Sequence, residues 1–294
     1  MDTAEKNLLR KYAYNVTSSD GEDGIIERIF EVVGAENKWC LELGALNGTH
    51  DSNVWNLINN KGWSSLLIEA DPTYFKKLAA LYAQNSDVLC LNEFVTFEGA
   101  QRLDALLAKT PIPKDFDLFV LDIDGSDYHL WDSLKEYQPR VVCVEFNQTI
   151  PNDISFVQPR DMTVFQGSSL GALKQLAGQK GYDLVATTGA NAFFVRTELF
   201  PLFNIVDNSL DVLHPDTQFH TRLYQLYDGT LVLDGYQTLF WHKIPVDVER
   251  LQVLPKSKRH YPAQISSSAG VRRLKEYVRT LPVYPYIQKI RKLL

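Results

Sequence analysis

Short apolar runs alternate with amphipathic stretches from Trp39 to Val144, and this rhythm limits the possible folds more than any other feature. Apolar runs of this kind, separated by helices, predict parallel strands buried on both faces of a sheet. Strands are expected at residues 39–43, 65–69, 88–91, 116–121 and 141–144, with helices near 3–12, 25–33, 52–60, 73–84 and 99–109.

The end of the predicted sheet differs from its beginning. A helix is expected from Ser168 to about Gln179, and two further strands at residues 182–187 and 192–196. Only residues 188–191 separate these strands, and so short a connection permits an antiparallel hairpin but no parallel return. We therefore expect an α/β fold: a doubly wound, mostly parallel, seven-stranded sheet that ends in an antiparallel hairpin and is followed by a C-terminal extension.

The composition is that of a globular protein, with 45% apolar and 22% charged residues. A net charge of -6 argues against broad binding of nucleic acid. The first residues show no signal-peptide pattern, and no apolar run approaches the length of a membrane span, so a cytoplasmic location is expected. Cys40, Cys90 and Cys143 lie in predicted strands without metal-ligand spacing, which indicates reduced core thiols.

Acidic and amide side chains follow two of the predicted strands. Asp122 and Asp124 follow the strand at 116–121, and Glu145 and Asn147 follow the strand at 141–144. Because side chains alternate between faces, each pair is expected to share one side, and neighbouring strands would bring both pairs to the carboxyl edge. Like charges crowded there destabilise a fold unless they are paired or bind a ligand. This cluster is the main indication of function.

A glycine-containing loop follows the first predicted strand. It contains Gly44 and Gly48, and glycines at this place let the backbone approach a ligand closely. Glu69 ends the second predicted strand, where a carboxylate can accept hydrogen bonds from both hydroxyls of a ribose. The alternative for Glu69 is a solvated acid in a loop.

The motifs Glu42-x-Gly44, Ile68-Glu69-Ala70-Asp71 and Asp122-x-Asp124-Gly125-x-Asp127, with the final hairpin, occur in the order seen in one known family. Residues 20–200 resemble the FkbM-like branch of class I S-adenosylmethionine-dependent methyltransferases. Asp124, where glutamate is common, and the long C-terminal segment depart from that pattern. The resemblance implies cofactor contacts by Glu42, Gly44, Ala45, Gly48, Glu69, Asn92, Glu93 and Asp122, with Glu69 at the ribose and Asn92 and Glu93 near the adenine.

The organisation expected from this resemblance has four parts. They are an N-terminal helical cap (1–34), a Rossmann-like domain that binds S-adenosylmethionine (35–200), a β-rich extension (201–254), and a linker with a basic amphipathic tail (255–294). In the extension, a turn is expected at 228–230, with strands at 231–233 and 238–241.

The carboxylates are expected to serve the methyl acceptor, because the sulfonium of the donor is already activated. They could deprotonate a hydroxyl, or they could hold a divalent metal such as Mg²⁺ that binds the acceptor. Asp122, Asp124, Glu145 and Asn147 are the expected ligands for such a metal. A pocket without metal remains an equal alternative.

His129 is the first candidate for the general base, because a histidine pKa suits proton transfer near neutral pH. The alternative is a hydrogen-bonded histidine at the start of a helix. Asp124 and Glu145 complete the catalytic candidates. The expected acceptor-binding residues are His50, Asn147, Gln166 and Ser168.

The expected function is therefore an S-adenosylmethionine-dependent O-methyltransferase acting on a sugar, a glycan or another polyhydroxylated metabolite. The alternatives are a non-catalytic assembly or scaffold protein with this fold and, less favoured, a nicotinamide-dependent oxidoreductase, for which Gly-x-Gly-x-x-Gly is incomplete. The expected partner is a small-molecule or glycan acceptor, with no nucleic acid, and an oligomer remains open. The tail 271–294 is basic, and it could be a solvated helix, pack in a dimer or contact a membrane surface.

Overall fold

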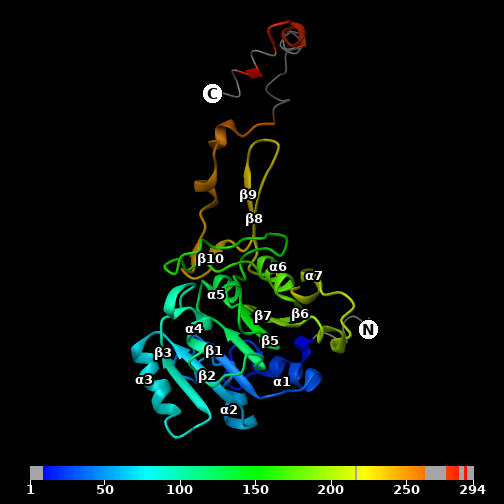
Figure 1. Cartoon of the computed structure of the whole chain (residues 1–294). Helices are drawn as coiled ribbons and strands as arrows, with labels where there is room; N and C mark the ends of the chain where they lie inside the picture. Colours follow the sequence, from blue (N-terminus) through cyan, green and yellow to red (C-terminus); the bar gives the residue numbers. More distant parts are fainter. Residues whose placement is uncertain (1–8, 216, 262–275, 285–287, 290–294) are drawn as a thin grey trace. The chain divides into compact units, whose positions relative to one another are not determined.

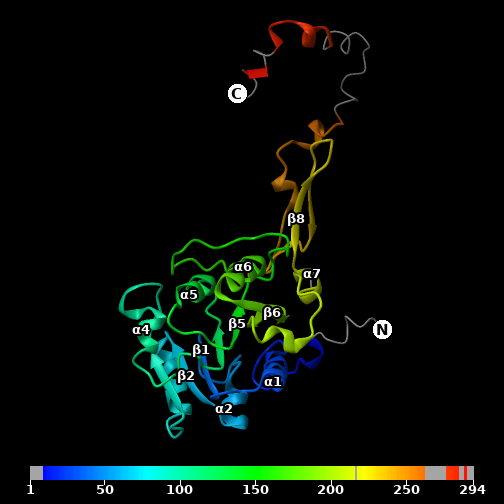
Figure 2. The ribbon, with the colours of Figure 1, turned by 45° about the vertical axis from the view of Figure 1, so that its right-hand side comes forward.

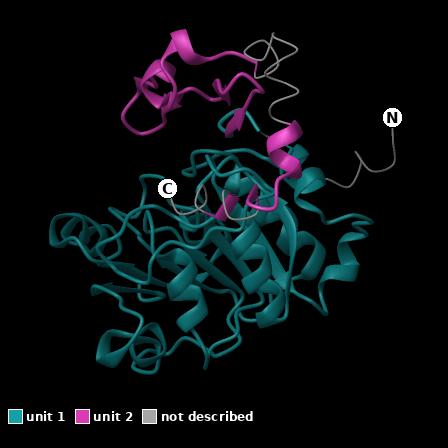
Figure 3. Ribbon diagram, turned by 90° about the horizontal axis from the view of Figure 1, so that it is seen from above, with its two compact units in different colours: residues 1–220 teal, residues 221–294 magenta. Residues whose placement is uncertain are grey.

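The computed structural model describes residues 9–215, 217–261, 276–284 and 288–289. It consists of two compact units, residues 1–220 and 221–294, each of which is described by itself (Figure 3). The division therefore falls after His220, whereas the sequence placed boundaries after residues 200 and 254. Among the described residues, no helix has both the length and the apolar character needed to cross a bilayer.

A seven-stranded sheet forms the centre of the first unit (Figure 1). Its strand order is β3-β2-β1-β4-β5-β7-β6; β1 to β5 pair in parallel, whereas β7 pairs antiparallel with both β5 and β6. This topology confirms the expected mostly parallel sheet with an antiparallel ending. The strands are β1 (Trp39–Leu43), β2 (Ser64–Glu69), β3 (Val88–Asn92), β4 (Leu118–Leu121), β5 (Val141–Glu145), β6 (Tyr182–Thr187) and β7 (Asn191–Arg196).

Helices cover both faces of the sheet, and each face has its own apolar cluster (Figure 2). On one face, strand residues such as Cys40, Val120 and Cys143 pack with α1 (Glu22–Val33), α2 (Trp55–Lys61) and α3 (Pro72–Leu81). On the other face, residues such as Leu121 and Val144 pack with α4 (Leu103–Leu107), α5 (Asp127–Ser133) and α6 (Leu170–Lys180). Each large apolar side chain buried this way contributes about 1.5–3 kcal/mol to folding.

Several helices differ in extent from the prediction. Helix α1 begins at Glu22, before the expected start at residue 25, and α2 begins only at Trp55. The stretch 99–109 divides into a 3₁₀ turn (Gly99–Gln101) and the short α4. Of the expected helix 3–12, the 3₁₀ turn η2 (Leu9–Tyr12) is described, and residues 1–8 lie outside the described part.

The amino edge of the sheet contains a buried acid whose charge is fully compensated. Asp117, just before β4, accepts hydrogen bonds from the backbone of residues 36–38. It also forms an ion pair with Arg140 at 2.8 Å, and Arg140 in turn donates to the carbonyls of Val33 and Gly34. Charges that are paired and hydrogen-bonded in this way are compatible with a stable interior. At the opposite edge, Asp122, Asp127 and Glu145 form no ion pair with a Lys or Arg of the described part of the chain.

The second unit contains two small antiparallel pairs of strands. The expected turn near 228–230 is present, but it joins β8 (Thr221–Gln225) to β9 (Leu231–Gly235). The expected strand at 231–233 is confirmed as part of β9, whereas its partner strand at 221–225, on the other side of the turn, was not predicted. Residues 238–239 form β10 (Thr238–Leu239), which pairs with β11 (Ile244–Pro245). Most of the tail 271–294, including the first of its expected helices up to residue 275, lies outside the described residues.

The remaining short elements connect or follow these strands. They are η4 (Phe200–Phe203), α7 (Leu210–Leu213), η5 (Val248–Leu251) and η6 (Lys256–Lys258).

Candidate functional site

Polar side chains from five strands share one face at the carboxyl edge of the sheet. Residues two positions before them, such as Cys40, Val120 and Cys143, pack against α1, α2 and α3. Because side chains alternate along a strand, the residues two positions further along β1, β2, β4 and β5 point to the same side. Asn191 begins the antiparallel β7 and lies opposite Glu145. The residues on this face are Glu42, Glu69, Asp122, Glu145 and Asn191.

Asp122 and Glu145 lie next to each other at the centre of this edge. Leu121 of β4 pairs with Val144 of β5, and the two acids directly follow these paired residues. Burial raises the pKa of Asp122 to about 8, and the negative charge of Asp127 acts in the same direction. Burial raises the pKa of Glu145 to about 10, with the charge of Asp122 as the next cause. The structure thus brings together two acids that favour the protonated state near neutral pH.

Asp127 is the third member of this group and lies in the first turn of α5. Its carboxylate accepts hydrogen bonds from the backbone N–H of Ile123 at 3.0 Å and of Gly125 at 2.9 Å, which closes the loop after β4. Burial nevertheless raises the pKa of Asp127 to about 6. Asp127 belongs to the motif Asp122-x-Asp124-Gly125-x-Asp127, but the motif alone did not indicate a role for it in the site.

The carboxylate of Glu42, at the end of the central strand β1, lies next to the residues that precede α2. Its carboxylate accepts hydrogen bonds from the backbone N–H of Asn53 at 2.7 Å and from the hydroxyl of Ser52 at 2.8 Å. Glu42 is 3% exposed, and burial raises its pKa to about 7 against the opposing effect of these two bonds. An anion already occupies the N–H groups where a helix N-terminus could otherwise bind phosphate.

The N-terminal turn of α1 contributes two more buried acids, Glu22 and Asp23. Glu22 accepts hydrogen bonds from the hydroxyl of Thr188 at 2.8 Å and from the side-chain amide of Asn191 at 3.3 Å. Its charge acts on Asp122, and the charge of Asp23 acts on Glu42. These acids therefore belong to the same group. The residue pattern alone did not indicate a role in the site for either acid.

Three acceptor oxygens beside these acids have no hydrogen-bond partner among the described residues. They are Oδ1 of Asp23, Oδ1 of Asn53 and Oδ1 of Asn191, and all three are buried. Asn191 pairs with Glu145 across the strands, while the backbone N–H of Asn53 bonds to Glu42. Buried polar atoms normally have a partner. Oxygens that lack one beside several carboxylates suit a ligand that donates hydrogen bonds and carries positive charge.

The glycine loop brings the ends of β1 and β4 close together. Gly44 has φ +91°, and a Cβ at this position would lie 1.9 Å from the carbonyl oxygen of Asp122. Gly48 has φ +82° and packs against Leu78 of α3, where a Cβ would approach to 2.7 Å. Internal packing therefore already requires both glycines. Between them, Ala45 is buried, and its N–H donates to the carbonyl of Ile68 at 3.2 Å.

Glu69 connects this loop to the end of β2. One of its oxygens accepts a hydrogen bond from Leu46 N–H and the other accepts one from Asp71 N–H, both at 2.7 Å. A carboxylate has about four acceptor positions, so about two remain for the hydroxyls of a ribose. The amide of Asn92 donates to the carbonyls of Glu69 and Ala70, and the half-buried Glu93 follows it.

His129 is buried in α5, and its ring is engaged away from the acids. Nε2 lies 2.8 Å from the carbonyl oxygen of Gln158, and the ring contacts those of Phe97 and Tyr128. This is the hydrogen-bonded helix histidine that the sequence left as an alternative. His50 has a largely exposed side chain, and its Nδ1 lies 3.6 Å from the carboxylate of Asp51.

The expected set of Asp122, Asp124, Glu145 and Asn147 is brought together in part, because the charge of Asp124 acts on both Asp122 and Glu145. β4 ends at Leu121 and β5 at Glu145. Asp122 still continues its strand, because its backbone N–H bonds to the carbonyl of Leu43, but Asp124 and Asn147 lie in loops where alternation does not apply. Asp124 lies exposed in a turn with φ +59°. Among the described residues, no three His, Cys, Asp or Glu side chains are arranged to hold a metal ion, and the expected Mg²⁺ ligand set is not supported.

Asn147 organises the loop after β5. Its side-chain oxygen accepts hydrogen bonds from the backbone and hydroxyl of Thr149, and its amide donates to the carbonyl of Gln166 at 2.7 Å. Its backbone N–H donates to the carbonyl of Ser168 at 2.9 Å, and the Ser168 hydroxyl accepts a bond from Gln158 N–H. Three of the expected acceptor-binding residues thus lie together, and they hold this loop in place.

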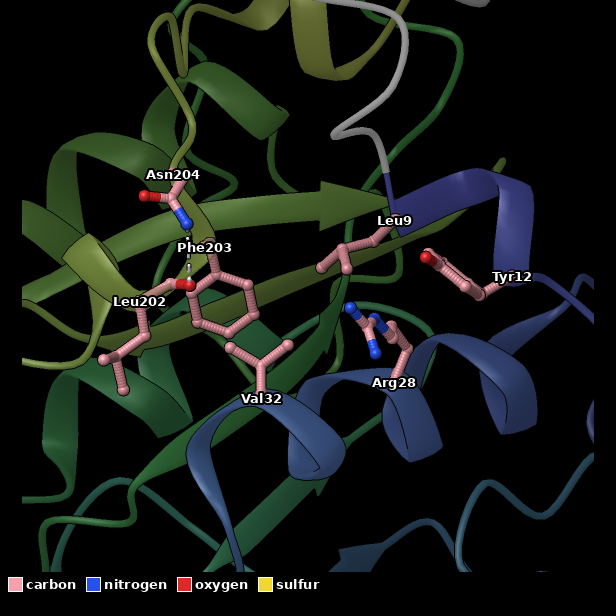
Figure 4. Close-up of a pocket in the computed structure, with 7 residues that line it drawn as sticks. All are labelled: Leu9, Tyr12, Arg28, Val32, Leu202, Phe203 and Asn204. Carbon is pink, nitrogen blue, oxygen red and sulfur yellow. Dashed lines mark hydrogen bonds between the residues drawn. The ribbon is translucent and has the colours of Figure 1, made fainter.

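A cavity of about 160 Å³ lies between η2, α1 and η4 (Figure 4). Arg28 of α1 and Tyr12 of η2 contribute its polar groups, and the guanidinium lies 4.8 Å from the Tyr12 ring centre. None of the acids described above lines it. Its volume is below the roughly 300 Å³ at which ligand pockets usually begin.

Comparisons with known proteins give likenesses to solved structures alone. No protein-family model and no curated protein matches the chain, so the expected FkbM-like branch is not confirmed. A candidate sarcosine dimethylglycine methyltransferase from Galdieria sulphuraria is 15% identical, with a TM-score of 0.36, and the match spans 55% of this chain and 64% of that one, which is less than two thirds of its length.

Two further solved structures match over most of their own length. The N-terminal domain of EvdMO1 with bound S-adenosylhomocysteine is 13% identical, with a TM-score of 0.40, over 66% of this chain and 95% of that one. An S-adenosylmethionine-dependent methyltransferase from Clostridium acetobutylicum ATCC 824 is 9% identical, with a TM-score of 0.38, over 60% and 90% of the two chains. TM-scores this low carry no argument about function, which has to come from the site itself.

Proposed function

We propose that this protein is an S-adenosylmethionine-dependent methyltransferase that methylates an oxygen atom. The observation that carries the proposal is the group of buried and half-buried acids at the carboxyl edge, none of which pairs with a Lys or Arg among the described residues, together with the buried oxygens that lack partners. S-adenosylmethionine carries a sulfonium and an ammonium group against one carboxylate. Such a ligand supplies both the positive charge and the N–H donors that this edge lacks.

The same group of acids disfavours the nicotinamide alternative. A dinucleotide places its pyrophosphate at the N-terminus of the helix after the first strand. In this protein Glu42 occupies the Asn53 N–H and the Ser52 hydroxyl at that place, and the backbone of Asp122 lies close against Gly44 of the loop after β1. A pyrophosphate there would meet negative charge instead of free N–H donors.

A non-catalytic scaffold role would not explain why these acids are present at the carboxyl edge of the sheet. Each buried ionised carboxylate reduces stability by several kcal/mol when it is unpaired, and here burial is the first cause of the raised pKa of Asp122, Asp127, Glu145 and Glu42. The paired Asp117 shows how this fold accommodates a purely structural acid.

In this proposal, different acids serve the donor and the acceptor. Glu42, Glu22 and Asp23 bind the ammonium end of the donor, Glu69 binds its ribose, and Asn92 and Glu93 lie near its adenine. When bound, the donor supplies an activated methyl group. The acceptor oxygen forms a bond to the methyl carbon while the bond between this carbon and sulfur breaks. The electron pair of the broken bond remains on sulfur. The hydroxyl proton passes to Asp122.

Asp122 is a better candidate for the base than His129. Its pKa of about 8 lies close to the operating pH, which is favourable for general-base catalysis. Glu145 retains its proton at neutral pH and can donate a hydrogen bond to a second oxygen of the acceptor. Carboxyl groups arranged in this way suit a sugar or another polyhydroxylated acceptor, and the loop held by Asn147 provides further polar groups beside it.

Thermal unfolding with added ligands tests the proposal. S-adenosylmethionine at 100 times its Kd stabilises by about 2.7 kcal/mol through mass action, whereas NAD at the same concentration should have no effect. Glu42→Gln is expected to weaken the shift, and Glu98→Gln, on the exposed surface, is the matched control. Absence of stabilisation by both S-adenosylmethionine and S-adenosylhomocysteine would contradict the proposal. Transfer of labelled methyl groups to a panel of sugars and glycans then identifies the acceptor.

A further inference from the structure

The second unit exposes much of its apolar surface. Within the described part of residues 221–294, Leu233 is the one hydrophobic residue that is buried. Exposed apolar side chains occur along this whole unit, as at Tyr227 and Val253, and three of them lie together on the β10–β11 hairpin, where Trp241 is 75%, Ile244 54% and Leu239 49% exposed. Large apolar side chains that remain exposed together mark an interaction surface.

The tip of this hairpin, residues 239–244, combines aromatic rings with a cation. The backbone N–H of Lys243 donates to the carbonyl of Leu239 at 2.8 Å and closes the turn. The Lys243 ammonium lies 4.3 Å from the centre of the Phe240 ring, and the rings of Phe240 and Trp241 meet edge to face at 5.2 Å. Aromatic rings with a polar edge, beside a lysine, are typical of protein segments at the boundary between water and lipid.

The charge of the chain is divided between the two units. Residues 221–294 carry 13 Lys and Arg against 5 Asp and Glu, whereas residues 1–220 carry 17 against 31. Among the described residues, Lys243, Lys256 and Lys258 are exposed and have no carboxylate within 4 Å. A cationic unit of this kind is attracted to anionic lipid, at about 1 kcal/mol for each basic residue near the surface, or about fivefold in affinity.

We propose that the tip of the β10–β11 hairpin docks on an anionic lipid surface, with Trp241 entering the interface and Lys243 contacting lipid headgroups. A protein partner is less suited to this tip, because a stable protein interface buries about 800 Å² on each side, more than a six-residue turn offers. The proposal is independent of the methyltransferase assignment. It extends the expected membrane contact of the tail 271–294 to residues that the structure describes.

Sedimentation of the full-length protein with lipid vesicles tests this proposal. We expect binding to vesicles of phosphatidylcholine with about a third phosphatidylglycerol, and little binding to phosphatidylcholine alone. Binding should be lost in 1 M salt, where the Debye length is about 3 Å. Trp241→Ala should lower the partition coefficient about tenfold, as expected for a large apolar side chain that is no longer buried, whereas Trp241→Phe should largely restore it. Lys243→Ala should lower it about fivefold.

Two variants in the first unit serve as matched controls. Phe165→Ala removes an aromatic ring that is 74% exposed, and Lys76→Ala removes an exposed lysine of α3. Both should bind vesicles as the unmodified protein does. The proposal is overturned if the protein does not sediment with anionic vesicles, or if the tip variants bind like the controls. It is also overturned if Trp241→Ala abolishes self-association in the absence of lipid and leaves vesicle binding unchanged, which would identify a second copy as the partner.

Discussion

Asn191 on β7 lies directly opposite Glu145 on β5, and its amide also donates to Glu22 at the start of α1. A neutral side chain therefore separates two acids. Asn191→Asp would place a third carboxyl group between them. We expect the free energy of unfolding to fall by about 3 kcal/mol at pH 8, in the range of an uncompensated buried charge.

The loss from Asn191→Asp should be smaller at pH 5.5, where the added group can remain protonated. Urea unfolding at the two pH values measures this difference. Asn59→Asp, on the exposed side of α2, is the control and should change stability little at either pH. An equal loss of unfolding free energy at both pH values would show that the charge of the added carboxyl group has no effect on stability. The loss would then come from the changed shape of the side chain alone.

The pKa of Glu42 makes stability depend on pH. Its folded-state value of about 7 lies above the unfolded value of about 4.3, so the folded protein binds more protons between these values. The contribution of Glu42 is therefore fully present below about pH 4 and is lost as the pH rises through 7. Asp122, with its pKa of about 8, extends the decline to higher pH.

Glu42→Gln should reduce this decline by about 3 kcal/mol between pH 5 and pH 8.5. Denaturant titrations at several pH values measure the slope, with Glu98→Gln as the surface control. A slope that Glu42→Gln leaves unchanged would mean that Glu42 is ionised in the folded protein throughout this range.

Asp122→Asn should remove the proposed base. We expect methyl transfer to slow by about 10²–10⁴-fold, the usual contribution of a general base, a larger change than in the affinity for S-adenosylmethionine. In the unmodified protein, kcat/KM should rise with pH and level off above about 8, and this rise should be absent in the variant. If His129→Gln instead abolishes the pH dependence and Asp122→Asn preserves it, the assignment of the base is wrong.

Gly44→Ala tests the close approach of β1 and β4. The added Cβ would lie 1.9 Å from the Asp122 carbonyl oxygen, so the ends of both strands would have to move. We expect a loss of at least about 3 kcal/mol in unfolding free energy, in the range of severe steric and backbone strain. Gly62→Ala is the matched control: its φ is also positive, at +67°, but nothing lies within 4 Å of the added Cβ. Its cost should be about 1 kcal/mol.

The sheet could be predicted from the sequence because its signals are local. Apolar runs at 39–43 and 141–144 indicate buried strands, and the short turn after Thr187 allows only a hairpin. Asp122 and Glu145 could be placed at one edge for the same reason. The prediction was wrong where it extended strand alternation to Asp124 and Asn147, because the backbone leaves the extended conformation before these residues.

The other members of the site depend on tertiary contacts that no local pattern reveals. Glu22 lies far from Thr188 and Asn191 in the sequence but contacts both. The Asp23 carboxylate accepts hydrogen bonds from the backbone N–H groups of residues 16–18, and these bonds hold the turn that precedes α1. Both acids lie in the segment Gly21-Glu22-Asp23-Gly24 at the start of α1. Only the packing of α1 against the hairpin shows which of its side chains are buried.

Isothermal titration of S-adenosylmethionine at pH 7.0, in two buffers of different ionisation enthalpy, tests the central claim most directly. At this pH the ammonium of the ligand is largely protonated, while Glu42, Asp122 and Glu145 retain much or all of their protons. A cation that binds among them lowers their pKa values, so the account predicts binding with a net release of protons, and less release in Glu42→Gln. Binding without proton release, or no binding at all, would contradict it.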